Sequence, residues 1–253
     1  MKPRAFDYLA PHTLAEALAL LAQHGTDAKV LAGGQSLVPL MNLRQVSPAL
    51  LVDINPLAEL GGIRQAEDGG LVLGALTRQQ QLATADLVRA TCPPLTAAAE
   101  MTAFPAVRSR GTLGGTIAQA EPGAQLPLAL CLLDASITLA STRGERTVPV
   151  SEVITGVNAT SLTPDELLIS VRVPALSPTA GCALREFRRG YAGPPLIAVA
   201  ALLVVDAAGQ IRQARLGLAG TDDVPLRLAD EEALLMGAPP TDDLFEEVAQ
   251  RAA

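Results

Sequence analysis

Two short segments that each contain a pair of glycines have the residue types and spacing to bind a ligand. The first consists of Ala32, Gly33, Gly34, Gln35 and Ser36, and the second of Thr112, Leu113, Gly114, Gly115 and Thr116. Because glycine lacks a Cβ atom, successive backbone N–H groups can approach an anion such as a pyrophosphate, and the neighbouring hydroxyls add donors. Neither segment fits the G-x-G-x-x-G or the P-loop pattern, since no lysine follows the glycines. Taken singly, each segment is more typical of a tight turn than of a ligand cradle.

Other residues that could do chemistry have weaker support. Ser36 lacks the G-x-S-x-G context of a nucleophile, and the chain's two histidines, His12 and His24, lie in or beside one predicted helix. Glu121 and Asp134 could form an acid–base pair, but carboxylates in loops are more often simply solvated. The sequence therefore argues against hydrolase chemistry.

Composition excludes several classes of partner. The 253 residues include 19 Lys and Arg against 26 Asp and Glu, which gives a formal net charge of −7. Nucleic acid and an anionic membrane are therefore poor partners. Aromatic residues make up only 2 % of the chain, so the core must consist of Leu, Val, Ile and Ala. The longest apolar run, residues 196–205, is half of the roughly 20 residues of a membrane span and predicts a buried strand.

The cysteines give no metal signature. Cys92, Cys131 and Cys182 stand far apart, without the close spacing of zinc or iron–sulfur ligands. We therefore expect no metal on this chain. Scattered, odd-numbered cysteines, together with the lack of an apolar leader, predict a cytoplasmic protein.

The first third of the chain predicts a small unit that resembles a βαβ motif. A capping box of Thr13 and Glu16, followed by apolar residues at helical spacing, predicts a helix over residues 13–24. Strands are predicted at 29–31 and 50–54. From residue 61 a new subdomain begins, with a hairpin at 63–65 and 71–73.

The remaining pattern mixes helices and strands. Thr77 with Gln80 predicts the cap of a short helix, a second helix begins at Pro94, and residues 104–116 are predicted to be a loop. A further helix is predicted at 126–133, and strands at 136–140, 146–150 and 167–173. After Pro174 and Pro178, a β-then-α module is predicted, with strands at 182–188, 196–205 and 211–219 and helices at 229–236 and 242–252.

The order and spacing of these motifs resemble the flavin-binding medium subunit of molybdenum hydroxylases, the family of carbon monoxide dehydrogenase and xanthine dehydrogenase. The residues that carry the resemblance are Phe6-Asp-Tyr8 with Pro11, Ala32–Leu37, Leu51–Ile54, Val107–Gly115, Pro164–Leu168 and Pro225–Arg227. They span nearly the whole chain.

The resemblance implies an α+β fold. It consists of a two-subdomain FAD-binding domain of the vanillyl-alcohol-oxidase type at 1–176, with subdomains of about 1–56 and 57–176. A small β-then-α C-terminal domain follows at 177–253, and it looks shorter than is usual in the family.

The resemblance also implies the cofactor contacts. Residues 32–36 and 112–116 look like the two FAD loops, whose backbone amides share the pyrophosphate, and Leu168 is implied as a further contact. A basic residue of the family is represented by Arg185. Gln125 stands where the family has a carboxylate that meets the cofactor, so Gln125→Asp is expected to strengthen FAD binding several-fold.

The function that the resemblance implies is electron transfer. A large partner subunit with a molybdenum cofactor hydroxylates the substrate, a small partner with [2Fe-2S] clusters relays electrons, and FAD on this chain passes them to NAD, a quinone or oxygen. No catalytic acid or base is assigned to this chain. We expect a heterotrimer that doubles to a hexamer. The alternative is a non-catalytic scaffold subunit of the same fold that binds FAD weakly or not at all.

Overall fold

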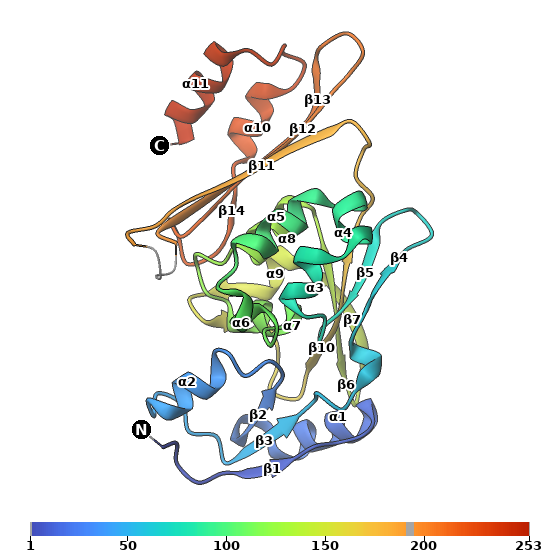
Figure 1. The fold of residues 1–253 in the computed structure, drawn as a ribbon, viewed down its shortest axis with the longest axis vertical. Coiled ribbons are helices and arrows are strands. Elements are labelled where there is room, and N and C mark those ends of the chain that lie inside the picture. Colours follow the sequence, from blue (N-terminus) through green and yellow to red (C-terminus); the bar gives the residue numbers. More distant parts are fainter. Residues whose placement is uncertain (1, 191–194, 253) are drawn as a thin grey trace.

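The structure is a computed structural model that describes residues 2–190 and 195–252 (Figure 1). Within these residues the strands form a three-stranded, a five-stranded and a four-stranded sheet, and one two-stranded ribbon. In Figure 1 the three-stranded sheet lies at one end of the molecule and the four-stranded sheet toward the other, with a cluster of helices between them.

The N-terminal sheet is parallel, with strand order β1-β3-β2. Its strands are β1 (Asp7–Leu9), β2 (Ala28–Leu31) and β3 (Leu50–Asp53), and its helices are α1 (Leu14–His24) and α2 (Leu37–Asn42). The predicted helix and βαβ-like unit are confirmed: Thr13 caps α1 by accepting from the Glu16 N–H at 3.2 Å. The three-residue β1 and the short α2 were not predicted, because neither segment is long enough to show a period.

The middle sheet is antiparallel, with strand order β4-β5-β10-β6-β7. Its strands are β4 (Ile63–Gln65), β5 (Leu71–Gly74), β6 (Ser136–Ser141), β7 (Gly144–Pro149) and β10 (Leu167–Val173). The predicted hairpin of β4 and β5 is confirmed. The ribbon of β8 (Ile154–Gly156) and β9 (Ala159–Thr160) follows the short helix α9 (Val150–Val153).

Between β5 and β6 the chain forms six helices. They are α3 (Gln79–Thr84), α4 (Asp86–Thr91), α5 (Pro93–Met101), α6 (Pro105–Arg108), α7 (Leu113–Gln119) and α8 (Gln125–Leu132). Of these, α5 and α8 pack against the C-terminal sheet. The predicted loop at 104–116 is wrong in part. Pro105 begins α6, and Thr112 caps α7 by accepting from the Gly115 N–H at 3.1 Å. The second glycine pair is therefore the first turn of a helix.

The predicted cap of α3 is displaced by one residue. The Thr77 hydroxyl donates to the Gly62 carbonyl at 2.8 Å and is not available as a cap. Instead the Arg78 N–H donates to Gln81 Oε1 at 2.8 Å, so Arg78 takes the N-cap position. The tertiary contact to Gly62 therefore decides where the helix begins.

The C-terminal sheet is antiparallel, with strand order β11-β12-β13-β14. Its strands are β11 (Ala180–Phe187), β12 (Ile197–Val205), β13 (Ile211–Ala219) and β14 (Leu226–Arg227), and two helices, α10 (Ala229–Leu235) and α11 (Asp242–Ala252), follow them. The predicted β-then-α order is confirmed, and the apolar run at 196–205 is the central strand β12. One cluster of buried residues joins β11 and β12 to the helices.

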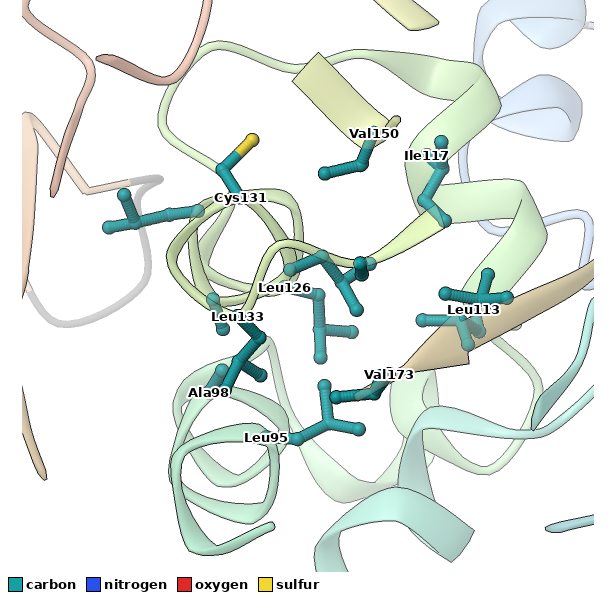
Figure 2. Close-up of a cluster of buried hydrophobic side chains, with 14 of the residues drawn as sticks. Leu95, Ala98, Leu113, Ile117, Leu126, Cys131, Leu133, Val150 and Val173 are labelled. Carbon is teal, nitrogen blue, oxygen red and sulfur yellow. The ribbon is translucent and has the colours of Figure 1, made fainter. Parts of the chain in front are cut away.

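The main core packs the helices against the middle sheet and against β11 and β12. Every residue of α8 is buried, so this helix runs through the centre of the molecule. Figure 2 shows Leu113 and Ile117 of α7 in the same cluster as Leu95, Leu126 and Val173. Leucine, isoleucine, valine and alanine dominate this core, as the composition predicts.

Candidate functional site

A cavity of about 1440 Å³ brings the two glycine segments together. Its volume exceeds the roughly 300–1,000 Å³ of ordinary small-molecule sites, which leaves room for a dinucleotide. The sequence-predicted residues that line it are Ala32, Gly33, Gly34, Gln35, Ser36, Thr112, Gly114, Gly115, Thr116, Gln125 and Leu168. Two others do not line it. The Leu113 side chain is fully buried in the core, and Arg185 is exposed, with its Nη1 donating to the Leu184 carbonyl at 2.9 Å.

The first glycine segment holds its backbone N–H groups ready for a ligand. Among the described residues, none accepts a hydrogen bond from the N–H of Gly33, Gly34, Gln35, Ser36 or Leu37. The carbonyls of the segment are occupied: Ala32 O accepts from Asn55 Nδ2 at 2.8 Å and Gly34 O from the Val38 N–H at 3.1 Å. Five consecutive unoccupied N–H groups in a cavity wall form a strong anion-binding site.

Four of the five backbone N–H groups in the second glycine segment donate within the protein, and only the Thr112 N–H has no acceptor among the described residues. Leu113 N–H donates to Thr77 O at 2.9 Å and Gly114 N–H to Ala75 O at 2.8 Å. The Gly115 N–H donates to Thr112 Oγ1, and the Thr116 N–H to Thr112 O at 3.0 Å. The N–H groups in the first turn of α7 therefore already have acceptors, whereas the resemblance implies that this segment shares the pyrophosphate.

The glycines of the two segments are required for different close approaches. A Cβ atom on Gly33 would lie 2.5 Å from the Arg110 carbonyl oxygen, so Gly33 lets the first segment approach the residues just before the second. A Cβ on Gly114 would lie 2.9 Å from the Ala75 Cβ, so Gly114 lets α7 pack on the end of β5. Gly34 has a φ of 73°, which lies in the left-handed region that favours glycine.

The hydroxyls of the second segment are also engaged. Thr116 Oγ1 donates to the Thr112 carbonyl at 3.0 Å and accepts from Gln79 Nε2 at 2.7 Å. The Gln79 side chain packs on Gly111, whose Cβ, if present, would overlap the Gln79 amide. The Gln79 backbone N–H also donates to Gly111 O at 2.9 Å. Gln79, which the sequence reasoning missed, thus fixes the second segment, and its glutamine type carries no signal for that role.

Asn55 and Asp53 support the first segment from behind. The Asn55 amide donates to Asp53 Oδ1 at 2.6 Å as well as to Ala32 O, and it accepts from Arg78 Nη2 at 2.8 Å. Partial burial opposes ionisation of Asp53, but hydrogen bonds from Tyr8 and Asn55 outweigh it and lower the pKa of Asp53. Asp53 and Asn55 line a second cavity of about 370 Å³, which residues 32–35 of the first segment also line. The position of Asn55 just after β3 was the only sequence signal for it.

Gln125 lies deep in the cavity wall and contacts the C-terminal sheet. It is 4 % exposed, and its Nε2 donates to Glu186 Oε2 at 2.6 Å. Glu186 in turn accepts from Arg188, with Nε to Oε1 at 2.6 Å. Arg188, which directly follows β11, lines the cavity, whereas Arg185 within the strand does not.

Leu168 reaches the cavity on a strand whose start is held by an ion pair between a buried carboxylate and an exposed arginine. Glu166 is 8 % exposed and accepts from Arg146 Nε at 2.6 Å and from the Thr163 N–H at 2.8 Å. The Arg146 hydrogen bond, followed by the Thr163 bond, lowers the pKa of Glu166 to about 2. The carboxylate is therefore ionised at neutral pH, and it fixes the start of β10.

These observations fit FAD. The free amides of the first segment suit a pyrophosphate, and the cavity continues along α7 to Gln125 and Leu168. None of the helices in the described part of the chain is long and apolar enough to cross a membrane.

Comparison with known proteins agrees with this fit. A family model described as the FAD binding domain in molybdopterin dehydrogenase matches residues 4–176. The 6-hydroxypseudooxynicotine dehydrogenase complex subunit alpha of Paenarthrobacter nicotinovorans is 40 % identical over 236 residues, which cover 93 % of this chain and 79 % of that protein. The carbon monoxide dehydrogenase medium chain of Hydrogenophaga pseudoflava is 36 % identical over 252 residues, which cover 100 % of this chain and 87 % of that protein.

Solved structures show the same fold. A carbon monoxide dehydrogenase from Hydrogenophaga pseudoflava matches with a TM-score of 0.95 at 36 % identity, covering 100 % of this chain and 87 % of that chain. Quinoline 2-oxidoreductase from Pseudomonas putida 86 matches with a TM-score of 0.93 at 32 % identity, with the same coverage. The predicted α+β fold, the predicted cofactor and the predicted family are confirmed. The chain belongs to the FAD-binding medium subunits of the molybdenum hydroxylase family, which are flavoprotein subunits of multi-subunit oxidoreductases.

Proposed function

We propose that this chain is the electron-transfer subunit of a molybdenum hydroxylase, accepting electrons from a small iron–sulfur partner and passing them to an external acceptor. The observation that carries the proposal is the row of free N–H groups from Gly33 to Leu37 in the wall of a dinucleotide-sized cavity. Bound FAD supplies reversible redox chemistry, and the protein supplies its position and electrostatics. The names of the relatives, which describe medium chains and subunits of dehydrogenase complexes, support the assembly with a large and a small partner.

Each part of the chain has a role in this proposal. The first segment binds the pyrophosphate, the saturated first turn of α7 shapes the wall beside it, and Gln125 and Leu168 contact the flavin half. Residues 1–176 form the FAD-binding domain, and 177–253 form a C-terminal domain that closes the cavity with Glu186 and Arg188. Three cysteines free of disulfides favour a reducing, cytoplasmic location.

The test is the flavin content of the complex purified after co-expression with its neighbouring large and small subunits. We expect a flavin absorption band, one FAD per copy of this chain, and bleaching of that band when the substrate of the large subunit is added. Sedimentation of the same preparation tests the heterotrimer and its doubling to a hexamer. A complex that assembles without flavin, and cannot be loaded with it, would instead support the scaffold alternative.

A further inference from the structure

The Gln125 amide has one occupied end and one free end. Its Nε2 donates to Glu186 Oε2 at 2.6 Å, whereas its Oε1 accepts no hydrogen bond from the described residues. The side chain is almost completely buried, yet it lines the cavity. With its donor end occupied, this amide can offer the cavity only an acceptor.

Glu186 determines that orientation. If the amide were turned over, Oε1 would face a carboxylate oxygen at 2.6 Å, and two acceptors at that distance repel each other. Glu186 cannot easily move away, because Arg188 holds both of its oxygens, at 2.6 and 3.0 Å. Arg188 is fixed in turn by donating to the Met101 carbonyl at 2.9 Å. The chain of contacts begins on the FAD-binding domain, passes through β11 and returns to the cavity wall.

We propose that Glu186 is a positioning residue that keeps Gln125 Oε1 turned toward the cofactor, where it accepts a hydrogen bond from the flavin half of FAD. This inference rests on the proposed function. The flavin half carries two kinds of donor, the ring N3–H and the ribityl hydroxyls, and both need an acceptor. A freely rotating amide would offer its donor end for part of the time and would bind either of them less tightly.

The contact also reverses an expectation from the sequence. Gln125→Asp loses the bond to Glu186 and brings a second carboxylate near it, and like charges in a partly buried site destabilise each other. The variant should therefore bind FAD more weakly, not several-fold more tightly.

A double-mutant cycle on the full-length chain tests the inference, with FAD affinity measured by flavin fluorescence quenching on apo-protein. Gln125→Leu and Glu186→Met should each weaken FAD binding about three- to tenfold, the size of one hydrogen bond. The double variant should lose no more than Gln125→Leu alone, because Glu186 acts through Gln125. Glu232→Met is the matched control: it breaks a similar carboxylate–arginine pair with Arg227, neither member of which lines the cavity, and should leave the affinity unchanged.

The results of this cycle, together with measurements on a modified cofactor and on the unmodified chain, decide whether Glu186 positions Gln125. Additive losses in the double variant, or an unchanged affinity in either single variant, would overturn the inference. With N3-methyl FAD the penalty of Gln125→Leu should vanish if the ring N–H is the donor and persist if a ribityl hydroxyl is. If the unmodified chain itself binds no FAD, the proposed function fails, and the inference fails with it. Thermal unfolding of each apo-protein separates a loss of affinity from a loss of fold.

Discussion

In the first glycine segment the N–H groups of Gly33 to Leu37 have no acceptor among the described residues, whereas in the second segment the N–H groups of Leu113 to Thr116 all have one. Both segments contain adjacent glycines and a nearby hydroxyl, and both line one cavity. In the first segment the N–H donors stay available for a ligand. In the second segment they donate within the protein, where they cap α7 and anchor it to Thr77 and Ala75. Similar composition thus serves ligand binding in one place and packing in the other.

Gly114→Val should damage the fold more than Gly34→Val, because a Cβ on Gly34 would meet only the side chains of Leu31 and Val38, both at 3.4 Å. A Cβ on Gly114 would meet the Ala75 Cβ at 2.9 Å and the Ala75 carbonyl at 3.0 Å, both on fixed backbone. Overpacking of this kind costs about 3 kcal/mol of unfolding free energy. Urea denaturation of the apo-protein measures it. A variant of normal stability that has lost FAD would place the ligand at the second segment instead.

Gly34→Val should weaken FAD binding about 100-fold while lowering the stability of the fold less than Gly114→Val does. A β-branched residue cannot hold a φ of 73° without strain, so the backbone that orients the free N–H groups must move. FAD titration measures the loss. Gly209→Val is the matched control, because Gly209 has a φ of 76° with open space around it and lies outside both cavities. Equal loss of FAD in both variants would show that strain alone, and not ligand contact, is responsible.

The ion pair behind Leu168 gives a pH dependence of stability. The folded pKa of Glu166, about 2, lies below its usual value of 4.5. The ionised Glu166 carboxylate therefore stabilises the fold fully above pH 4.5, and this stabilisation is lost as the pH falls toward 2. We expect the free energy of unfolding to fall by about 2 kcal/mol over that range, a figure that already allows for the exposure of Arg146. Chemical unfolding at several pH values should show that the stability of Glu166→Gln depends less on pH than that of the unmodified protein. The same pH dependence in both proteins would show that the ion pair does not contribute to stability.

The smallest expected effects come from removing the hydroxyl groups of Ser36 and Thr112, one in each glycine segment. Ser36→Ala removes an exposed group of the first segment and should weaken FAD binding about threefold with no change in stability. Thr112→Val removes the cap of α7 and should cost about 1 kcal/mol of stability with unchanged FAD affinity. Paired titration and unfolding curves test both. The reverse pattern would contradict the assignment of ligand binding to the first segment.

Sequence alone predicted much of the fold because the patterns were local. The box of Thr13 and Glu16 gave α1, and the run at 196–205 gave β12. Residues 104–116 were misread because glycine disfavours helices, while the cap at Thr112 and the contacts to Thr77 and Ala75 are satisfied only in the folded chain.

The site was predicted only in outline for the same reason. Both glycine segments and Gln125 do line the cavity, but which amides are occupied depends on partners that lie far away in the sequence. Glu186 was missed because only the register of β11 decides which of its charged side chains face the cavity, and Arg188 was considered as a phosphate ligand but set aside as an ordinary surface arginine. Gln79 and Asn55 are common polar residues whose contacts no spacing reveals.

Native-state hydrogen exchange with and without FAD tests the central claim most directly, because it reports on the N–H groups themselves. In the apo-protein, the amides of residues 33–37 should exchange quickly and those of 113–116 slowly. Saturation with FAD should slow exchange at 33–37 and change 113–116 little. Unchanged exchange at 33–37 in the FAD-saturated protein, or new protection confined to 113–116, would contradict the assignment of the pyrophosphate to the first glycine segment.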